Sequence, residues 1–163
     1  MKYLVYCDGS TKANGQVNAV GGWAYALLSE NYGTLSAADS GGEIGTTNQR
    51  MELTAAIKAL ERVMPMVGLF DEVEICTDSA YLHNCYAQGW YRNWQMNGWK
   101  NSKKQPVANQ DLWELLVPYF ETANVKFTKV KGHADNVWNN YVDDLAQTAA
   151  ARLQEKMNAS NSN

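Results

Sequence analysis

Hydrophobic and polar positions follow two different periods along the chain, and the period predicts where strands and helices lie. Short β-branched and aromatic runs are typical of strands, and five occur, at 3–8, 23–29, 34–40, 73–77 and 125–130. Apolar residues three or four positions apart predict helices at 48–64, 90–96, 111–121 and 137–157, with a further helix that Ser79 can cap. The glycine-containing stretch 12–22 and the tripeptide 31–33 indicate turns.

The order of these elements predicts an α/β fold. Three sequential strands joined by short loops favour an antiparallel meander, and later strands separated by helices favour parallel additions. We therefore expect a mixed five-stranded sheet, antiparallel over its first three strands and then parallel, with helices packed on both faces. A single domain is expected over residues 1–157, followed by a polar tail at 158–163 that is expected to be disordered.

Four acidic side chains stand where a carboxylate is costly to place. Asp8 and Asp78 each close an apolar strand, Glu52 lies near the start of a helix, and Asp143 lies inside the last helix. If the first and fourth strands are parallel neighbours, Asp8 and Asp78 lie side by side at their carboxyl ends. Clustered carboxylates destabilise a fold unless a cation offsets their charge, and oxygen ligands suit Mg²⁺ or Mn²⁺. The pattern predicts a metal-dependent enzyme.

The net charge of −3 argues only weakly against a nucleic-acid partner, because the charge is unevenly distributed. No Asp or Glu occurs from 79 to 110, whereas Arg92, Lys100, Lys103 and Lys104 all lie there. Such a local basic patch matters more for phosphate binding than the overall charge does.

The cysteine pattern and the hydropathy predict a cytoplasmic protein. Cys7, Cys76 and Cys85 form no CxxC pair and are expected to stay reduced. The amino terminus runs directly into a strand without a signal pattern, and no apolar run approaches the length of a membrane span.

Five short motifs occur together in one order. They are Asp8-Gly9-Ser10, Thr46-Thr47-Asn48-Gln49-Arg50-Met51-Glu52-Leu53, Thr77-Asp78-Ser79, Val130-Lys131-Gly132-His133-Ala134 and Asp143-Asp144-Leu145-Ala146. Together they resemble type 1 ribonuclease H, the RNase HI family, over residues 3–153. The resemblance implies the RNase H-like fold and hydrolysis of the RNA strand of an RNA/DNA hybrid, leaving 5′-phosphate and 3′-hydroxyl ends with little sequence preference.

The resemblance also implies roles for the acids and for one histidine. Asp8, Glu52, Asp78 and Asp143 would hold two Mg²⁺ ions, with Asp8 bridging them and Mn²⁺ as a substitute. Two cations ~3.5–4 Å apart suit phosphodiester hydrolysis because they stabilise both the attacking and the leaving oxygen. His133 would shuttle a proton or help to release the product, since an imidazole titrates near neutral pH.

Substrate contacts follow from the same resemblance. Asn14, Asn48 and Gln49 match minor-groove positions, where an amide can both donate to and accept from a 2′-hydroxyl group. Thr47 and Asn109 match positions that hold a phosphate of the DNA strand, although turn and cap chemistry also favours these residue types.

A basic protrusion is the last implied contact. Trp90, Lys100, Lys103 and Lys104 resemble a protrusion that grips the DNA strand in some members, whereas Trp94, Trp99 and Trp113 are expected in the core. Gln95-Met96-Asn97 stands where bacterial members often carry basic residues, and Ala80 stands where a glutamine often contacts RNA. We expect a monomer with a weakened grip and no obligate protein partner.

Three other functions remain open from the residues alone. Integrases and junction resolvases use a similar acid-bearing sheet, but they lack the motifs around Glu52 and His133. A binding module without catalysis would give no product in a nuclease assay. A glycosidase also uses paired carboxylates, and its activity would be indifferent to EDTA.

Overall fold

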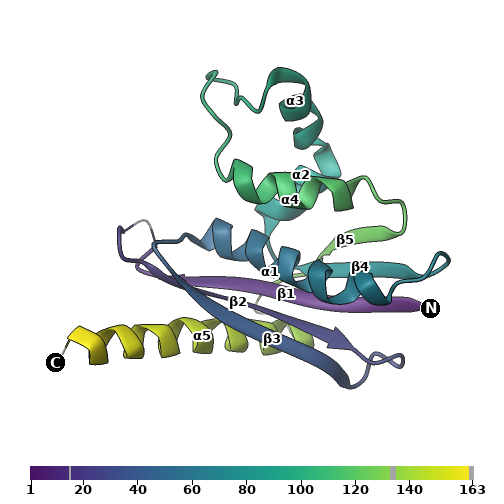
Figure 1. The fold of residues 1–163 in the computed structure, drawn as a ribbon. Helices are drawn as coiled ribbons and strands as arrows, with labels where there is room; N and C mark the ends of the chain where they lie inside the picture. Colours follow the sequence, from purple (N-terminus) through teal and green to yellow (C-terminus); the bar gives the residue numbers. More distant parts are fainter. Residues whose placement is uncertain (15, 133–134, 162–163) are drawn as a thin grey trace.

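The computed structural model describes residues 1–14, 16–132 and 135–161, and its centre is a five-stranded sheet of order β3-β2-β1-β4-β5 (Figure 1). β1 pairs antiparallel with β2, and β2 with β3, whereas β4 and β5 add in parallel. The mixed sheet predicted from the element order is confirmed. The strands are β1 (Lys2–Lys12), β2 (Val20–Leu28), β3 (Leu35–Ile44), β4 (Glu72–Thr77) and β5 (Val125–Lys129).

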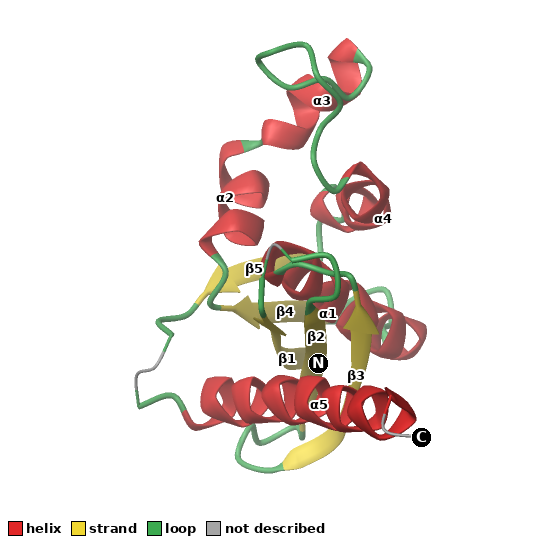
Figure 2. Cartoon of the chain, turned by 90° about the vertical axis from the view of Figure 1, so that its left-hand side faces the viewer, coloured by secondary structure: helices red, strands yellow, loops and turns green. Residues whose placement is uncertain are grey.

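Helices cover both faces of the sheet, as predicted. The longest helix packs on one face, against β1, β2 and β3, and the first helix packs on the other (Figures 1 and 2). Three shorter helices extend the second side away from the sheet, and α3 lies farthest out (Figure 2). The helices are α1 (Asn48–Val63), α2 (Ala80–Gln88), α3 (Trp90–Asn97), α4 (Gln110–Phe120) and α5 (Val137–Asn161), with a 3₁₀ turn η1 (Met64–Met66) after α1.

The stretch 12–22 was predicted as a turn, and residues 16–18 form one, but both ends of the stretch belong to strands. β1 continues to Lys12 and β2 already begins at Val20, so that Ser10 pairs with Gly22. The glycine serves helix packing: a β-carbon on Gly22 would lie 2.0 Å from the carbonyl oxygen of Ala146 in α5. Glycine in a strand marks such a close approach, which a local pattern does not distinguish from a turn.

Helix α5 extends beyond the predicted boundary at Met157. It continues to Asn161, so residues 158–161 are helical where a disordered tail was predicted. No glycine or proline interrupts the helix, and the side chain of Gln154 donates to Asn158 Oδ1 at 3.0 Å, one turn along. Side-chain bonds of this spacing stabilise a helix end.

The two sides of the sheet are packed differently. The larger core lies under α1, where Val5, Leu60 and Trp113 are fully buried. On the other side, small residues of β2 such as Ala24 meet Ala146, which lets α5 lie close to the strands. The three cysteines are buried and free, as predicted. In the described part of the chain no helix combines the length and the apolar character that a membrane span needs.

Candidate active site at the carboxyl edge of the sheet

Asp8 and Asp78 meet because β1 and β4 are parallel neighbours. Their register pairs Tyr6 with Cys76, and two further residues along each strand place Asp8 opposite Asp78. Asp8 is 5% exposed, in the centre of this edge. The juxtaposition predicted from the sequence is therefore confirmed.

Glu52 reaches this edge because α1 packs directly on β1. A β-carbon on Gly9 would lie 2.4 Å from the backbone nitrogen of Glu52, so only glycine next to Asp8 allows this contact. Ser79 then fixes the Glu52 side chain: its hydroxyl donates to Glu52 Oε2 at 2.6 Å and accepts from the Leu82 N–H at 3.1 Å. One serine both caps α2 and holds the carboxylate.

Asp143 joins the cluster from the opposite face of the sheet. It is half-buried on α5 and accepts from Gln147 Nε2 at 3.0 Å, and its carboxyl lies close enough to Asp8 to raise the pKa of that group. All four predicted acids are thus brought to one edge, by two strands and two helices.

Asn139 is a site residue that the sequence analysis missed. It is 1% exposed in the first turn of α5, and its Nδ2 donates to Asp78 Oδ2 at 3.5 Å. Its Oδ1 is buried and has no hydrogen-bond partner in the described structure. Gly132 packs against the same carboxylate, since a β-carbon there would lie 3.1 Å from Asp78 Oδ2. A fully buried polar residue in an amphipathic helix is the signal that could have found Asn139.

The surroundings of Asp8 and Glu52 raise the pKa of both acids. Burial, followed by the nearby carboxylate of Asp78 and the contact with Asp143, raises the pKa of Asp8 to about 9. Burial also raises the pKa of Glu52, with Asp78 acting in the same direction and the Ser79 hydrogen bond against it. Burial away from water and repulsion between carboxylates both disfavour the ionised acids. A bound cation would favour the ionised form and so lower the pKa again.

The donor set fits a hard divalent cation, which prefers carboxylate oxygens. Within residues 1–14, 16–132 and 135–161, however, no three Asp, Glu, His or Cys side chains converge into a ready-made cation site. The acids share one edge of the sheet, and their carboxylate oxygens are the groups that would hold such a cation.

The predicted minor-groove residues lie after β1 and at the start of α1, the helix that carries Glu52. Asn14 Oδ1 accepts from the backbone N–H of Asn48 at 3.0 Å, which joins the end of β1 to the start of α1. Asn14, Asn48 and Gln49 are all exposed. Thr47 caps α1, with Oγ1 accepting from the Arg50 N–H at 3.1 Å, so the cap role considered for it is real.

The predicted protrusion lies apart from the acids. Trp90 is half-buried at the start of α3, and its indole nitrogen donates to Gln88 Oε1 at 2.9 Å. Lys100, Lys103 and Lys104 are exposed in the loop after α3, at the end of the molecule farthest from the sheet (Figure 2). Of the tryptophans predicted in the core, Trp113 is fully buried, whereas Trp94 and Trp99 are half-buried and pack against the core.

His133 lies outside the described residues.

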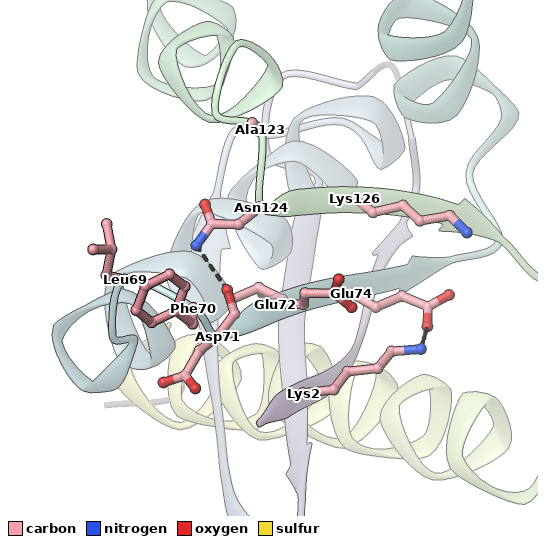
Figure 3. Close-up of a pocket in the computed structure, with 10 residues that line it drawn as sticks. Lys2, Leu69, Phe70, Asp71, Glu72, Glu74, Ala123, Asn124 and Lys126 are labelled. Carbon is pink, nitrogen blue, oxygen red and sulfur yellow. Dashed lines mark hydrogen bonds and ion pairs between the residues drawn. The ribbon is translucent and has the colours of Figure 1, made fainter.

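A separate hollow of about 500 Å³ lies at the amino ends of β4 and β5, at the opposite edge of the sheet (Figure 3). Lys2 forms an ion pair with Glu74 at 2.6 Å there, and Leu69 and Phe70 lie on its rim. None of the four clustered acids lines it.

The strand order, the helices on both faces and the acids at the carboxyl edge define an α/β protein of the RNase H-like class. The family model described as RNase H matches residues 1–151, and the chain belongs to this family. A protein named ribonuclease H from Syntrophomonas wolfei is 44% identical over 150 residues, which cover 92% of this chain and 97% of the relative.

Solved structures agree with this assignment. A type 1 RNase H with the type 2 active-site motif is 30% identical and superposes with a TM-score of 0.75, covering 92% of this chain and 72% of its own. A second neighbour, LC11-RNase H1 in complex with RNA/DNA hybrid, has a TM-score of 0.66 at 22% identity, covering 93% of this chain and 99% of its own. Because its sequence identity is only 22%, the second match supports the fold alone.

Proposed function

We propose that this protein is an endoribonuclease that hydrolyses the RNA strand of RNA/DNA hybrids, leaving 5′-phosphate and 3′-hydroxyl ends with little sequence preference. The observation that carries the proposal is the gathering of Asp8, Glu52, Asp78 and Asp143 at one edge of an RNase H-like sheet. The name of the relative that is 44% identical supports the same activity.

The proposed cofactor is Mg²⁺: Asp8, Glu52, Asp78 and Asp143 would hold two ions, and Mn²⁺ could substitute. When bound, the ions supply positive charge on both sides of the scissile phosphodiester. The chain orients the ligands: Ser79 holds Glu52, and Asn139 with Gly132 holds Asp78. Asp8 must lose its proton to act as a ligand, so cation binding releases protons.

His133 is proposed to move a proton during turnover or to assist product release. The contact between its neighbour Gly132 and Asp78 supports this proposal. An imidazole can both accept and donate a proton near neutral pH.

The proposed substrate contacts surround the cluster. Asn14, Asn48 and Gln49 would bond the 2′-hydroxyl groups that distinguish RNA, and Thr47 and Asn109 would hold a phosphate of the DNA strand. Trp90 and the three lysines Lys100, Lys103 and Lys104 would contact the DNA strand farther along the duplex.

A cleavage panel tests the function directly. Labelled RNA–DNA, RNA–RNA, DNA–DNA and single-stranded RNA are incubated with the protein in Mg²⁺ and in EDTA. We expect cuts only in the RNA of the hybrid, and only with Mg²⁺, because the acid cluster needs a cation. Equal cleavage of duplex DNA would favour an integrase-like reaction, and full activity in EDTA would rule out the metal mechanism.

Replacing Lys100, Lys103 and Lys104 together with alanine is expected to raise KM for the hybrid and to leave kcat largely intact. Lysines remote from the acids would contribute uniform binding and not transition-state binding. Each lost phosphate contact should flatten the log–log salt dependence of binding by roughly one unit.

The matched control replaces Lys58, Lys126 and Lys156, which removes the same charge outside the proposed contact surface. If both triple variants changed KM equally, overall charge would explain the effect. An unchanged KM and salt slope in the first variant would place the hybrid elsewhere.

We also propose a cytoplasmic monomer whose catalytic domain spans residues 1–157 and needs no obligate protein partner. The three buried, unpaired cysteines are consistent with a reducing compartment.

A further inference from the structure

Asn109 has an unusual conformation at the start of α4. Its φ of 62° lies in the left-handed region, and although it occupies the N-cap position, its side chain makes no cap hydrogen bond. An N-cap asparagine normally accepts from the first turn of its helix, which stabilises the helix. Asn109 has a strained backbone and lacks the cap hydrogen bond that would stabilise it. Other interactions must therefore hold it in place, and such strain is often found at functional sites.

Both ends of the Asn109 amide are held by other side chains. Oδ1 accepts from Arg50 Nη1 at 3.3 Å, and Nδ2 donates to the Tyr81 hydroxyl at 3.1 Å. The same hydroxyl accepts from the indole nitrogen of Trp113 at 3.0 Å, and Trp113 is fully buried. The amide is therefore anchored to the core on one side and to α1 on the other.

Arg50 is itself locked by a two-pronged ion pair. Its Nη1 and Nη2 donate to Asp111 Oδ1 and Oδ2 at 3.0 and 2.8 Å. The planar fork of an arginine fixes geometry in this arrangement better than a lysine could. The Asp111 side chain is 64% exposed, so the pair contributes little to stability; its effect is to join the first turns of α4 and α1.

This network leaves hydrogen-bond donors unused. Asn109 Nδ2 carries a second N–H, and the Tyr81 hydroxyl, which already accepts twice, still has its own proton. Neither donor has a partner in the described part of the chain. Two neutral donors beside an arginine, at the starts of two helices, suit an anionic oxygen ligand.

We propose that Arg50, locked by Asp111, is a positioning residue that holds Asn109 at the start of α4, near the Thr47 cap of α1, for a phosphate group of the substrate duplex. The inference rests on the proposed function, because it assumes that Asn109 contacts the DNA strand. Arg50 acts through Asn109, and Asp111 acts through Arg50.

Two substitutions distinguish a positioning role of Arg50 and Asp111 from a simple effect of their charge on hybrid binding. Asp111→Ala removes a negative charge, so electrostatics alone would tighten binding to a polyanion, whereas loss of positioning weakens it. Arg50→Lys keeps the charge and loses the fork, so electrostatics alone predicts no change. We expect both variants to raise Kd for a labelled RNA/DNA hybrid on the order of tenfold, about the worth of one charge-assisted hydrogen bond.

Binding is measured by fluorescence anisotropy in EDTA, where cleavage does not interfere, and thermal melts confirm that each variant is folded. Glu61→Ala is the matched control, because it removes an acid that pairs with Lys58 on the same helix. We expect its Kd to match that of the unsubstituted protein. If Asp111→Ala does not fold, Asp111→Asn makes the same test with nearly the same volume.

A double-mutant cycle then tests whether the residues act through Asn109. Asn109→Ala should raise Kd, and adding Asp111→Ala to it should raise Kd no further. Additive effects, or an Asp111→Ala variant that binds as tightly as the unsubstituted protein, would overturn the inference. A protein that binds the hybrid but does not cut it would overturn the proposed function and leave the positioning result standing.

Discussion

Replacing Asp8 with asparagine is expected to reduce cleavage of an RNA/DNA hybrid by at least about 10³-fold, the scale of losing an essential catalytic group. Asp8 lies at the centre of the cluster, where the nearby carboxyl groups of Asp78 and Asp143 both raise its pKa. Asparagine is nearly isosteric but supplies one neutral oxygen, so the proposed metal site would lose the charge of one ligand.

The measurement is single-turnover cleavage at increasing Mg²⁺ concentration. The matched control is Asp144→Asn, which removes an exposed acid next to Asp143 and should leave the rate unchanged. An Asp8→Asn variant that retains more than about a tenth of the activity would show that Asp8 is not essential.

The metal-free protein is expected to lose stability steadily as the pH rises from about 4 to about 9. The pKa of Asp8 is about 9 in the folded protein, against an ordinary value of 3.8. Between these values the folded state retains a proton that the unfolded chain has lost, so the free energy of unfolding falls with rising pH. At about 1.4 kcal/mol for each pKa unit, the loss reaches several kcal/mol.

Thermal melts in EDTA between pH 5 and pH 8 test this expectation. Asp8→Asn should flatten the pH dependence and melt at a higher temperature than the unsubstituted protein at pH 8. Mg²⁺ should stabilise the unsubstituted protein more at pH 8 than at pH 5, because at low pH protons compete for the same carboxylates. If the melting temperatures of the two proteins changed equally with pH, Asp8 would not be the cause of the loss of stability.

The sequence by itself was sufficient for the elements, the sheet and the acid cluster. Strand and helix periods are local signals, and the carboxyl ends of adjacent parallel strands necessarily share one edge. The meeting of Asp8 and Asp78 could thus be predicted without coordinates. Glu52 and Asp143 were placed with them by the motifs, and the structure brings both to the same edge.

Contacts between residues distant in sequence were decided by the tertiary structure alone. The sequence pattern predicts a turn at glycines such as Gly22, whereas in the structure Gly22 allows α5 to approach the sheet closely. The contact of Asn139 with Asp78, and those of Arg50 with Asn109 and Asp111, could not be predicted from the sequence. Such partners depend on how helices cross a sheet, because a hydrogen bond forms only within a few tenths of an ångström of its ideal distance, and no local pattern specifies that geometry.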